Sequence, residues 1–251
     1  MLDFHNDYLA SLPVSIRKGW QSRARLVELH KGEHIDLSIQ TDVIYFPITA
    51  VAAMSARSGT GPPVFLRFTG RHFAIGVANL LKAGEIRFEG WVCGTGYAMA
   101  IPAGLILNDL KSITASSPLQ ARLMARIAEK GLFCNHCATN HLCAKRLARL
   151  LLEARDAFGP ERGITLSQRE LSDLLAVRRE TVAELLGAWS AEGVIECGRA
   201  SISILDIDGL GAKSCECYRL IKRFDDEELS IWRGIPWRGD APERARLTSS
   251  M

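Results

Sequence analysis

No long apolar segment occurs in this chain of 251 residues: no stretch approaches the ~18 consecutive apolar residues of a membrane-spanning helix. Its first residues, MLDFHNDYLASLP, carry two aspartates and no apolar core, so we expect no secretory signal peptide. The nucleotide P-loop and the GxSxG and HExxH motifs of hydrolases are also absent, as is any internal repeat. These absences favour a cytoplasmic protein that does not contact membranes and is not an enzyme.

Neither sign of charge dominates the chain. Its 31 lysines and arginines against 28 aspartates and glutamates leave a net charge of +3, which is compatible with a nucleic-acid partner but is no evidence for one. With 47% hydrophobic and 24% charged residues, the composition is that of a globular protein with room for about two domains. The seven cysteines, an odd number without secretory context, indicate a reducing compartment and free thiols.

Short β-rich runs fill residues 20–107. Turn-forming residues separate them, for example Lys31-Gly32-Glu33 and Gly94-Thr95-Gly96. Strands at such even spacing predict an antiparallel sandwich or roll. The expected strands are Arg25 to Leu29, Val43 to Phe46, Val51 to Ser55, Val64 to Phe68, Gly90 to Val92 and Tyr97 to Ile101.

The pattern becomes helical after residue 117. Apolar residues at helical spacing predict one helix from Pro118 to about Phe133 and a second from about Cys143 to Ala157, which ends at Gly159-Pro160. Beyond about Leu210 we expect one more short helix. A tail rich in proline, glycine and arginine follows, and its composition predicts poor order.

Residues 165–205 have the pattern of a winged helix-turn-helix. Ser167 and Glu170 stand at the spacing of a capping box, in which each side chain accepts a backbone N–H at the start of a helix. After a break at Ala176-Val177, a second helix is expected from residue 178 or 179. Its apolar face consists of Val182, Leu185, Leu186 and Trp189.

The second helix and the segment after it have the features of a DNA reader. Arg178 and Arg179 point outward in its first turn, where major-groove recognition needs them, and two short strands around Gly198-Arg199 predict a wing. Between 165 and 205, however, four basic residues stand against six acidic ones. Because phosphate attraction supplies much of the affinity for DNA, one copy should bind weakly, and two copies in a dimer would relieve this.

A β-rich half, a linking helix and a C-terminal winged helix-turn-helix together resemble the Crp/Fnr family of bacterial transcription regulators. The resemblance covers about residues 20–220 and is strongest at the C-terminal end. It rests on Arg146 to Leu152, Leu166 to Leu171, Val177 to Val182, Ile202 to Asp206 and Cys215 to Tyr218, and in the β-rich half on Val43 to Pro47 and Ile101 to Ala103.

The resemblance implies an α+β fold and a homodimer. The dimer would be joined through Leu119, Leu123 and Ile127, bind a two-fold symmetric operator in double-stranded DNA, and work with RNA polymerase. The implied parts are an antiparallel β-roll similar to cyclic-nucleotide-binding domains at 1–117, a dimerisation helix at 118–141, a winged helix-turn-helix domain at 142–222 and a flexible tail at 223–251.

Carried over residue by residue, the resemblance places Arg179, Glu180 and Glu184 at positions that read base edges. Arginine pairs with guanine O6 and N7, and a carboxylate accepts from cytosine N4, so the first two residue types suit this role. Glu184 departs from better-known members, which carry arginine there, and the operator should therefore differ from theirs. Phosphate contacts are implied for Gln168, Arg169, Arg178, Thr181 and Arg199.

A second departure lies in the turn between the two helices. Ala176 stands where glycine is usual, and alanine enters the left-handed conformation at a cost of order 1 kcal/mol.

The sequence lacks most of the residues with which family members bind a cyclic-nucleotide effector. Members that bind cyclic nucleotides use a Gly-Glu pair and, about ten residues later, an Arg-Ser/Thr-Ala run. Here the segments read Gly76-Val77-Ala78 and Arg87-Phe88-Glu89, so the glutamate and the small hydroxyl donor are both missing. Only Arg87 remains as a candidate effector contact, and a surface position is the simpler interpretation. We expect no cyclic-nucleotide binding and no cofactor, and the effector is unknown or absent.

The cysteines suggest a different sensor. Cys134, Cys137 and Cys143 have the spacing with which iron–sulfur members of the family hold a cluster, although in those members the cysteines precede the β-roll. Cys137 and His141 also match a Cys-x3-His of the subgroup without clusters, and buried free cysteine packs as a small apolar side chain. A structural role is the main interpretation, here and for Cys215-x-Cys217, with metal binding or redox sensing as the alternative.

Two classes of function fit these observations. The first is a dimeric, sequence-specific transcription regulator. The second is a protein-assembly module whose helix-turn-helix has lost its DNA role, which Glu184 and the acidic balance favour. Arg178, Arg179 and the wing favour the first, and it is the function we predict.

Overall fold

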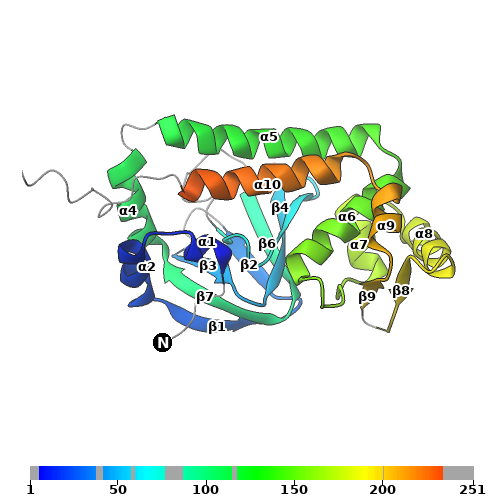
Figure 1. Ribbon diagram of the computed structural model, residues 1–251, viewed down its shortest axis with the longest axis horizontal. Helices are drawn as coiled ribbons and strands as arrows, with labels where there is room; N and C mark the ends of the chain where they lie inside the picture. Colours follow the sequence, from blue (N-terminus) through cyan, green and yellow to red (C-terminus); the bar gives the residue numbers. More distant parts are fainter. Residues whose placement is uncertain are drawn as a thin grey trace, which may run out of the picture.

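A computed structural model of the chain describes residues 6–37, 42–57, 60–76, 87–114, 118–199 and 201–233. A β-rich half and a helical half lie next to each other, and two long helices run along one side of the molecule (Figure 1). No helix in these ranges is both long and apolar enough to cross a membrane.

Seven strands in the described residues of the first half form two antiparallel sheets, and the sequence predicts the antiparallel arrangement but only six of these strands. One sheet has the order β1-β7-β3 and the other β2-β6-β4-β5. Apolar side chains of both sheets, among them Leu29, Ala52 and Val92, share one buried cluster, so the sheets enclose a common core. The strands are β1 (Arg25–Leu29), β2 (His34–Leu37), β3 (Val43–Pro47), β4 (Val51–Arg57), β5 (Val64–Thr69), β6 (Arg87–Gly94) and β7 (Gly96–Pro102).

Three helices close one end of this β-roll. Trp20 and Ile106 are buried with Phe46 of β3 in a second cluster, and the indole N–H of Trp20 donates to Asp109 Oδ2 (2.7 Å). Asn6 caps the first helix, because its side chain accepts from the backbone of residues 8 and 9. The helices are α1 (Asp7–Ala10), α2 (Val14–Gln21) and α4 (Ala103–Thr114).

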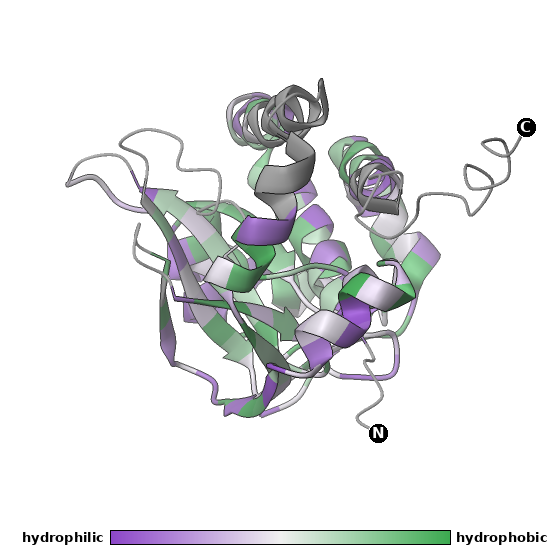
Figure 2. Cartoon of the chain, turned by 90° about the vertical axis from the view of Figure 1, so that its left-hand side faces the viewer, coloured by the Kyte–Doolittle hydropathy of each residue, from purple (hydrophilic) through white to green (hydrophobic). Residues whose placement is uncertain are grey.

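The two long helices are α5 (Pro118–Asn140) and α10 (Cys217–Arg233). They lie side by side on the same face of the β-roll, as Figures 1 and 2 show from two directions. Lys130 of α5 donates to Asp225 of α10 (2.6 Å), and the rings of Phe133 and Phe224 meet edge to face. The expectation of one short helix beyond about Leu210 is therefore wrong: α9 (Ile207–Lys213) spans that position, and the 17-residue α10 follows and takes up the first eleven residues of the expected tail. Residues 234–251 lie outside the described part.

The second half is built around α6 (Cys143–Phe158), which begins and ends close to its predicted limits. Leu147, Leu150 and Leu151 are fully buried in one cluster that includes Phe65 and Phe68 of the β-roll as well as the helix-turn-helix core. One apolar core therefore joins the two halves. The remaining elements are α7 (Gln168–Leu175), α8 (Arg179–Ala191), β8 (Ile195–Cys197), β9 (Ile202–Ile204) and α9 (Ile207–Lys213).

Candidate DNA-binding surface

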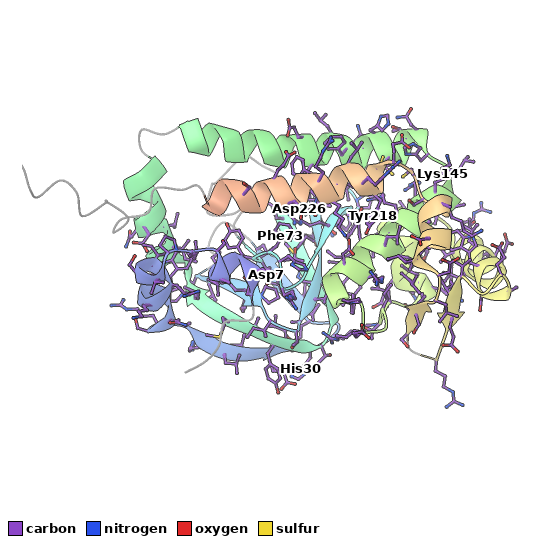
Figure 3. All side chains as sticks on the ribbon, viewed as in Figure 1. Asp7, His30, Phe73, Lys145, Tyr218 and Asp226 are labelled. Carbon is purple, nitrogen blue, oxygen red and sulfur yellow. The ribbon has the colours of Figure 1, made fainter. Side chains whose placement is uncertain are left out.

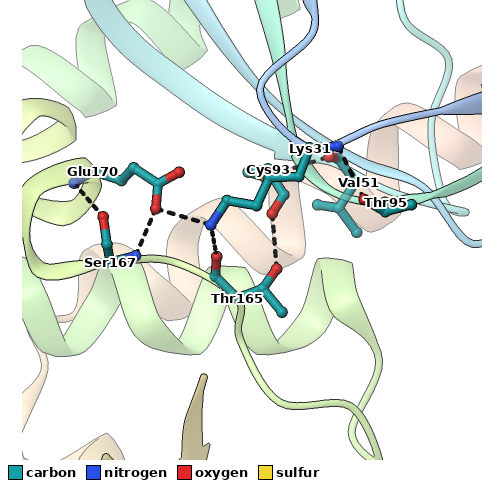
Figure 4. A network of polar contacts seen from close by, with 7 residues as sticks. All are labelled: Lys31, Val51, Cys93, Thr95, Thr165, Ser167 and Glu170. Carbon is teal, nitrogen blue, oxygen red and sulfur yellow. Dashed lines mark hydrogen bonds and ion pairs between the residues drawn. The ribbon is translucent and has the colours of Figure 1, made fainter. Parts of the chain in front are cut away.

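The N-terminus of α7 has the capping box that the sequence predicts. Glu170 N–H donates to Ser167 Oγ (3.2 Å), and Ser167 N–H donates to Glu170 Oε2 (2.6 Å). The same carboxylate accepts from Lys31 Nζ of the β-roll (3.1 Å), and Thr165 Oγ1 donates to the carbonyl of Cys93 (2.8 Å; Figure 4). The helix start is thus fixed both locally and against the β-roll.

The turn between α7 and α8 depends on a left-handed residue. Ala176 has φ 53° and ψ 50°, and among the described residues it is the one non-glycine with positive φ. Val177 N–H donates to the carbonyl of Ser172 (3.0 Å), the long-range bond of a Schellman motif. Arg146 Nη2 of α6 donates to the carbonyl of Leu175 (2.5 Å) and so caps α7. This turn, which sequence patterning predicts, sets the angle between the two helices.

Helix α8 separates its apolar and polar side chains as expected. Val182, Leu186 and Trp189 are buried in the core, whereas Arg178, Arg179, Glu180 and Glu184 are exposed and Thr181 is partly exposed. None of these four exposed side chains forms a hydrogen bond or ion pair with another described residue. At 100° per residue, Arg179, Glu180 and Glu184 span an arc of about 140° on the helix. The predicted base-reading residues therefore share one accessible face.

The predicted phosphate contacts outside α8 lie on α7 and on the hairpin that follows α8. Gln168 and Arg169 lie on the first turn of α7, partly exposed and exposed, respectively. Arg199 is exposed in the turn between β8 and β9, which the bond from Gly198 N–H to the carbonyl of Ser201 closes (2.8 Å). The wing is therefore present where the sequence predicts it.

Arg87, the candidate effector contact, lies at the limit of the described residues. Gly76 ends one described range with φ 101°, and residues 77–86 lie outside it, as does the side chain of Arg87. The backbone of Arg87 begins β6 opposite Arg57 of β4. The expectation that the chain binds no cyclic nucleotide stays a prediction.

The helix predicted to form the dimer exists: it ends at Asn140, beyond the limit near Phe133 that periodicity predicts and one residue before the limit of 118–141 that the resemblance implies. The side chains of Leu119, Leu123 and Ile127 lie outside the described part. Further along the helix lies Leu132, an apolar residue that is not among the three predicted dimerisation residues, and its side chain is 68% exposed.

The three cysteines with the spacing of a cluster motif lie in different surroundings, and the Cys/His group that could hold a metal ion contains only one of them, Cys137. Cys134 Sγ donates to the carbonyl of Leu66 (3.4 Å), and Cys143 begins α6 partly exposed. Cys137 is fully buried and lies 3.6 Å from Cys215, sulfur to sulfur. The spacing motif could not show this contact, because Cys215 is 78 residues away from Cys137 in the sequence.

Comparisons with known proteins agree with this geometry. Residues 145–213 match the family model of the Crp-like helix-turn-helix domain. No curated protein matches the chain in sequence.

Solved structures share this fold over three quarters or more of the chain. A protein from Eubacterium rectale assigned to the Crp/Fnr family of transcriptional regulators is 16% identical, with a TM-score of 0.60 over 85% of this chain and all of that one. FixK2 from Bradyrhizobium japonicum is 18% identical, with a TM-score of 0.57 over 76% of this chain and 98% of its own. A CRP-family regulator from Thermus thermophilus is 19% identical, with a TM-score of 0.55 over 75% of this chain and 96% of its own.

The chain therefore contains a Crp-like helix-turn-helix domain and has the fold of Crp/Fnr transcriptional regulators, a β-roll of the cyclic-nucleotide-binding type followed by a DNA-binding domain. This confirms the resemblance drawn from the sequence and the α+β fold that it implies.

Proposed function

We propose that the protein is a sequence-specific transcription regulator of the Crp/Fnr type, acting as a homodimer on a two-fold symmetric operator. The observation that carries this proposal is the first turn of α8, where Arg178, Arg179 and Glu180 are exposed and engage no other described side chain. Charged side chains without internal partners, held on a helix with a packed opposite face, are available for base edges and phosphates.

The roles follow from the chemistry of each position. Arg179 reads guanine, Glu180 accepts from cytosine or adenine amino groups, and Glu184 excludes bases and phosphates that would place an acceptor near it. Arg169 and Arg199 contact the backbone on either side, together with Gln168, Arg178 and Thr181.

Two copies are needed for useful specificity. One recognition helix reads only a few base pairs, and the four positive charges of residues 165–205 are outnumbered by six negative ones. Helix α5 offers an exposed apolar residue, Leu132, on a 23-residue rod that borders the DNA-binding domain. We infer that α5 pairs with its counterpart in a second chain.

The regulator works in the cytoplasm with RNA polymerase, needs no cyclic nucleotide and catalyses no reaction. Mapping of its binding sites on the genome, combined with transcript measurements in a deletion strain, tests the function. The account predicts discrete sites upstream of genes whose transcripts change, and loss of those sites in an Arg179→Ala strain. Uniform or absent DNA occupancy with unchanged transcripts would favour an assembly module instead.

A further inference from the structure

Four potential metal ligands meet at the junction of α5, α6 and α10. Cys137 lies in the last turn of α5 and His141 directly after it, while Cys215 precedes α10 and Cys217 begins it. Their ligand atoms all lie within 4.8 Å of one another. Cys137 Sγ is 3.6 Å from Cys215 Sγ, and Cys217 Sγ is 3.6 Å from His141 Nδ1.

These distances suit a single tetrahedral ion. With Zn–S bonds of about 2.3 Å and Zn–N bonds of about 2.0–2.1 Å, the ligand atoms of a tetrahedral site are roughly 3.6–3.8 Å apart. The two measured pairs lie at this separation. A cluster of several irons would hold its thiolates further apart, and a disulfide would bring two sulfurs to about 2.05 Å.

The surroundings of the four residues are those of a closed site. Cys137 and Cys217 are fully buried, and Cys215 is 3% exposed. Water therefore has little access to an ion held between these three sulfur atoms and His141. Structural zinc sites are closed in this way, whereas catalytic ones keep a position open.

A carboxylate orients the histidine. Glu216 Oε1 lies 3.3 Å from His141 Nε2, on the side of the ring opposite Nδ1. Metal-bound histidines donate their second ring N–H to such a carboxylate, which fixes the tautomer with Nδ1 free to bind the ion. Here one short segment, Cys215-Glu216-Cys217, supplies two ligands and the residue that orients a third.

We propose that Cys137, His141, Cys215 and Cys217 bind one Zn²⁺ ion in a structural Cys3His site. The ion joins the end of α5 to the start of α10. It lies beside the short link between α5 and α6, which consists of residues 141 and 142. It thereby fixes how the DNA-binding domain sits on the dimerisation helix. The site uses Cys137 from the sequence motif but neither Cys134 nor Cys143.

The metal content of the intact protein tests this directly. Protein purified under reducing conditions without chelator should contain about one zinc per chain by inductively coupled plasma mass spectrometry. After exchange of zinc for Co²⁺, we expect the visible bands of a tetrahedral cobalt site together with thiolate-to-cobalt charge transfer in the near ultraviolet. These spectra report the ligands without any substitution.

Matched variants identify the ligands. His141→Ala and Cys215→Ser should lose the zinc, while His136→Ala and Cys143→Ser, which change neighbouring residues outside the proposed set, should retain it. Wild-type protein that takes up neither zinc nor Co²⁺ when these are supplied would overturn the proposal. Equal zinc loss in His136→Ala would also contradict the assigned ligands. None of these measurements involves DNA, so their outcome is independent of the proposed function.

Discussion

At the scale of single residues, we expect the replacement of Arg179 to change DNA recognition most. Its side chain is exposed on the first turn of α8 and engages no other described residue. If it pairs with guanine, Arg179→Ala should weaken binding to the operator by about 1–3 kcal/mol and relax the preference at one base pair in each half-site.

Arg169→Ala is the matched control, because this exposed arginine of α7 is assigned to phosphate. It should weaken binding to all sequences about equally. Gel-shift titrations of both variants on a pool of operator sequences separate the two effects. An unchanged sequence preference in Arg179→Ala would remove this residue from the base-reading set.

Ala176 provides a residue-scale test of the turn. The left-handed backbone of Ala176 destabilises the folded state by roughly 1–2 kcal/mol. Glycine would remove this strain, but part of the gain would be lost because glycine makes the unfolded chain more flexible. We expect Ala176→Gly to raise the free energy of unfolding by about 0.5–1 kcal/mol in urea titrations. Ala188→Gly, on the exposed side of α8, should lower it by about 1 kcal/mol. A loss of stability in both variants would show that the turn is not strained.

At the scale of elements, the start of α7 combines a local cap with a contact to the β-roll. Ser167→Ala should lower the free energy of unfolding by about 1 kcal/mol, since a backbone N–H loses its acceptor. Glu170→Gln retains a capping side chain and loses only the ion pair with the partly exposed Lys31, so it should cost less than ~1 kcal/mol. Denaturant titrations compare the two. A larger loss in Glu170→Gln would mean that docking on the β-roll outweighs the cap.

Elements defined by local patterns could be predicted from the sequence. The capping box, the turn at Ala176, the apolar face of α8 and the wing each depend on residues within a few positions of one another, and each is present. The four-residue strand β2 gave no pattern long enough to recognise, and only the centre of the eight-residue β6 was found.

Features that depend on distant residues could not be predicted in this way. The polar segment after residue 223 reads as a tail, yet it continues α10 because Phe224 and Asp225 pack against Phe133 and Lys130 of α5. Cys137 likewise meets Cys215 only in the folded chain. Spacing along the sequence therefore predicted helix α8, but it could not show which sulfur lies next to Cys137.

At the scale of the whole molecule, the DNA-binding domain is held firmly against the rest of the chain. Arg162 Nη1 donates to the carbonyl of Thr49 in the β-roll (2.6 Å). Tyr218 of α10 donates to Asp156 of α6 (2.8 Å), and Figure 3 shows its side chain between the two helices. With the shared core around α6, these contacts make the position of α8 depend on both halves.

Dimerisation through α5 is a prediction at this scale. Leu132→Asp introduces a charge at an exposed apolar position of the helix, so it should yield monomers in light scattering and lose specific DNA binding. Val14→Asp, at a residue 54% exposed on α2, serves as the control and should remain dimeric. Monomers of Leu132→Asp that still bind a palindrome with full affinity would contradict the proposed assembly.

Selection of binding sites from random double-stranded DNA tests the central claim most directly. A homodimer with one α8 in each of two successive major grooves predicts an enriched inverted repeat whose half-site centres lie about 10–10.5 base pairs, or ~34 Å, apart. The enrichment should occur without added cyclic nucleotide. A pool that shows no enriched sequence, or only a single unrepeated half-site, would contradict the account.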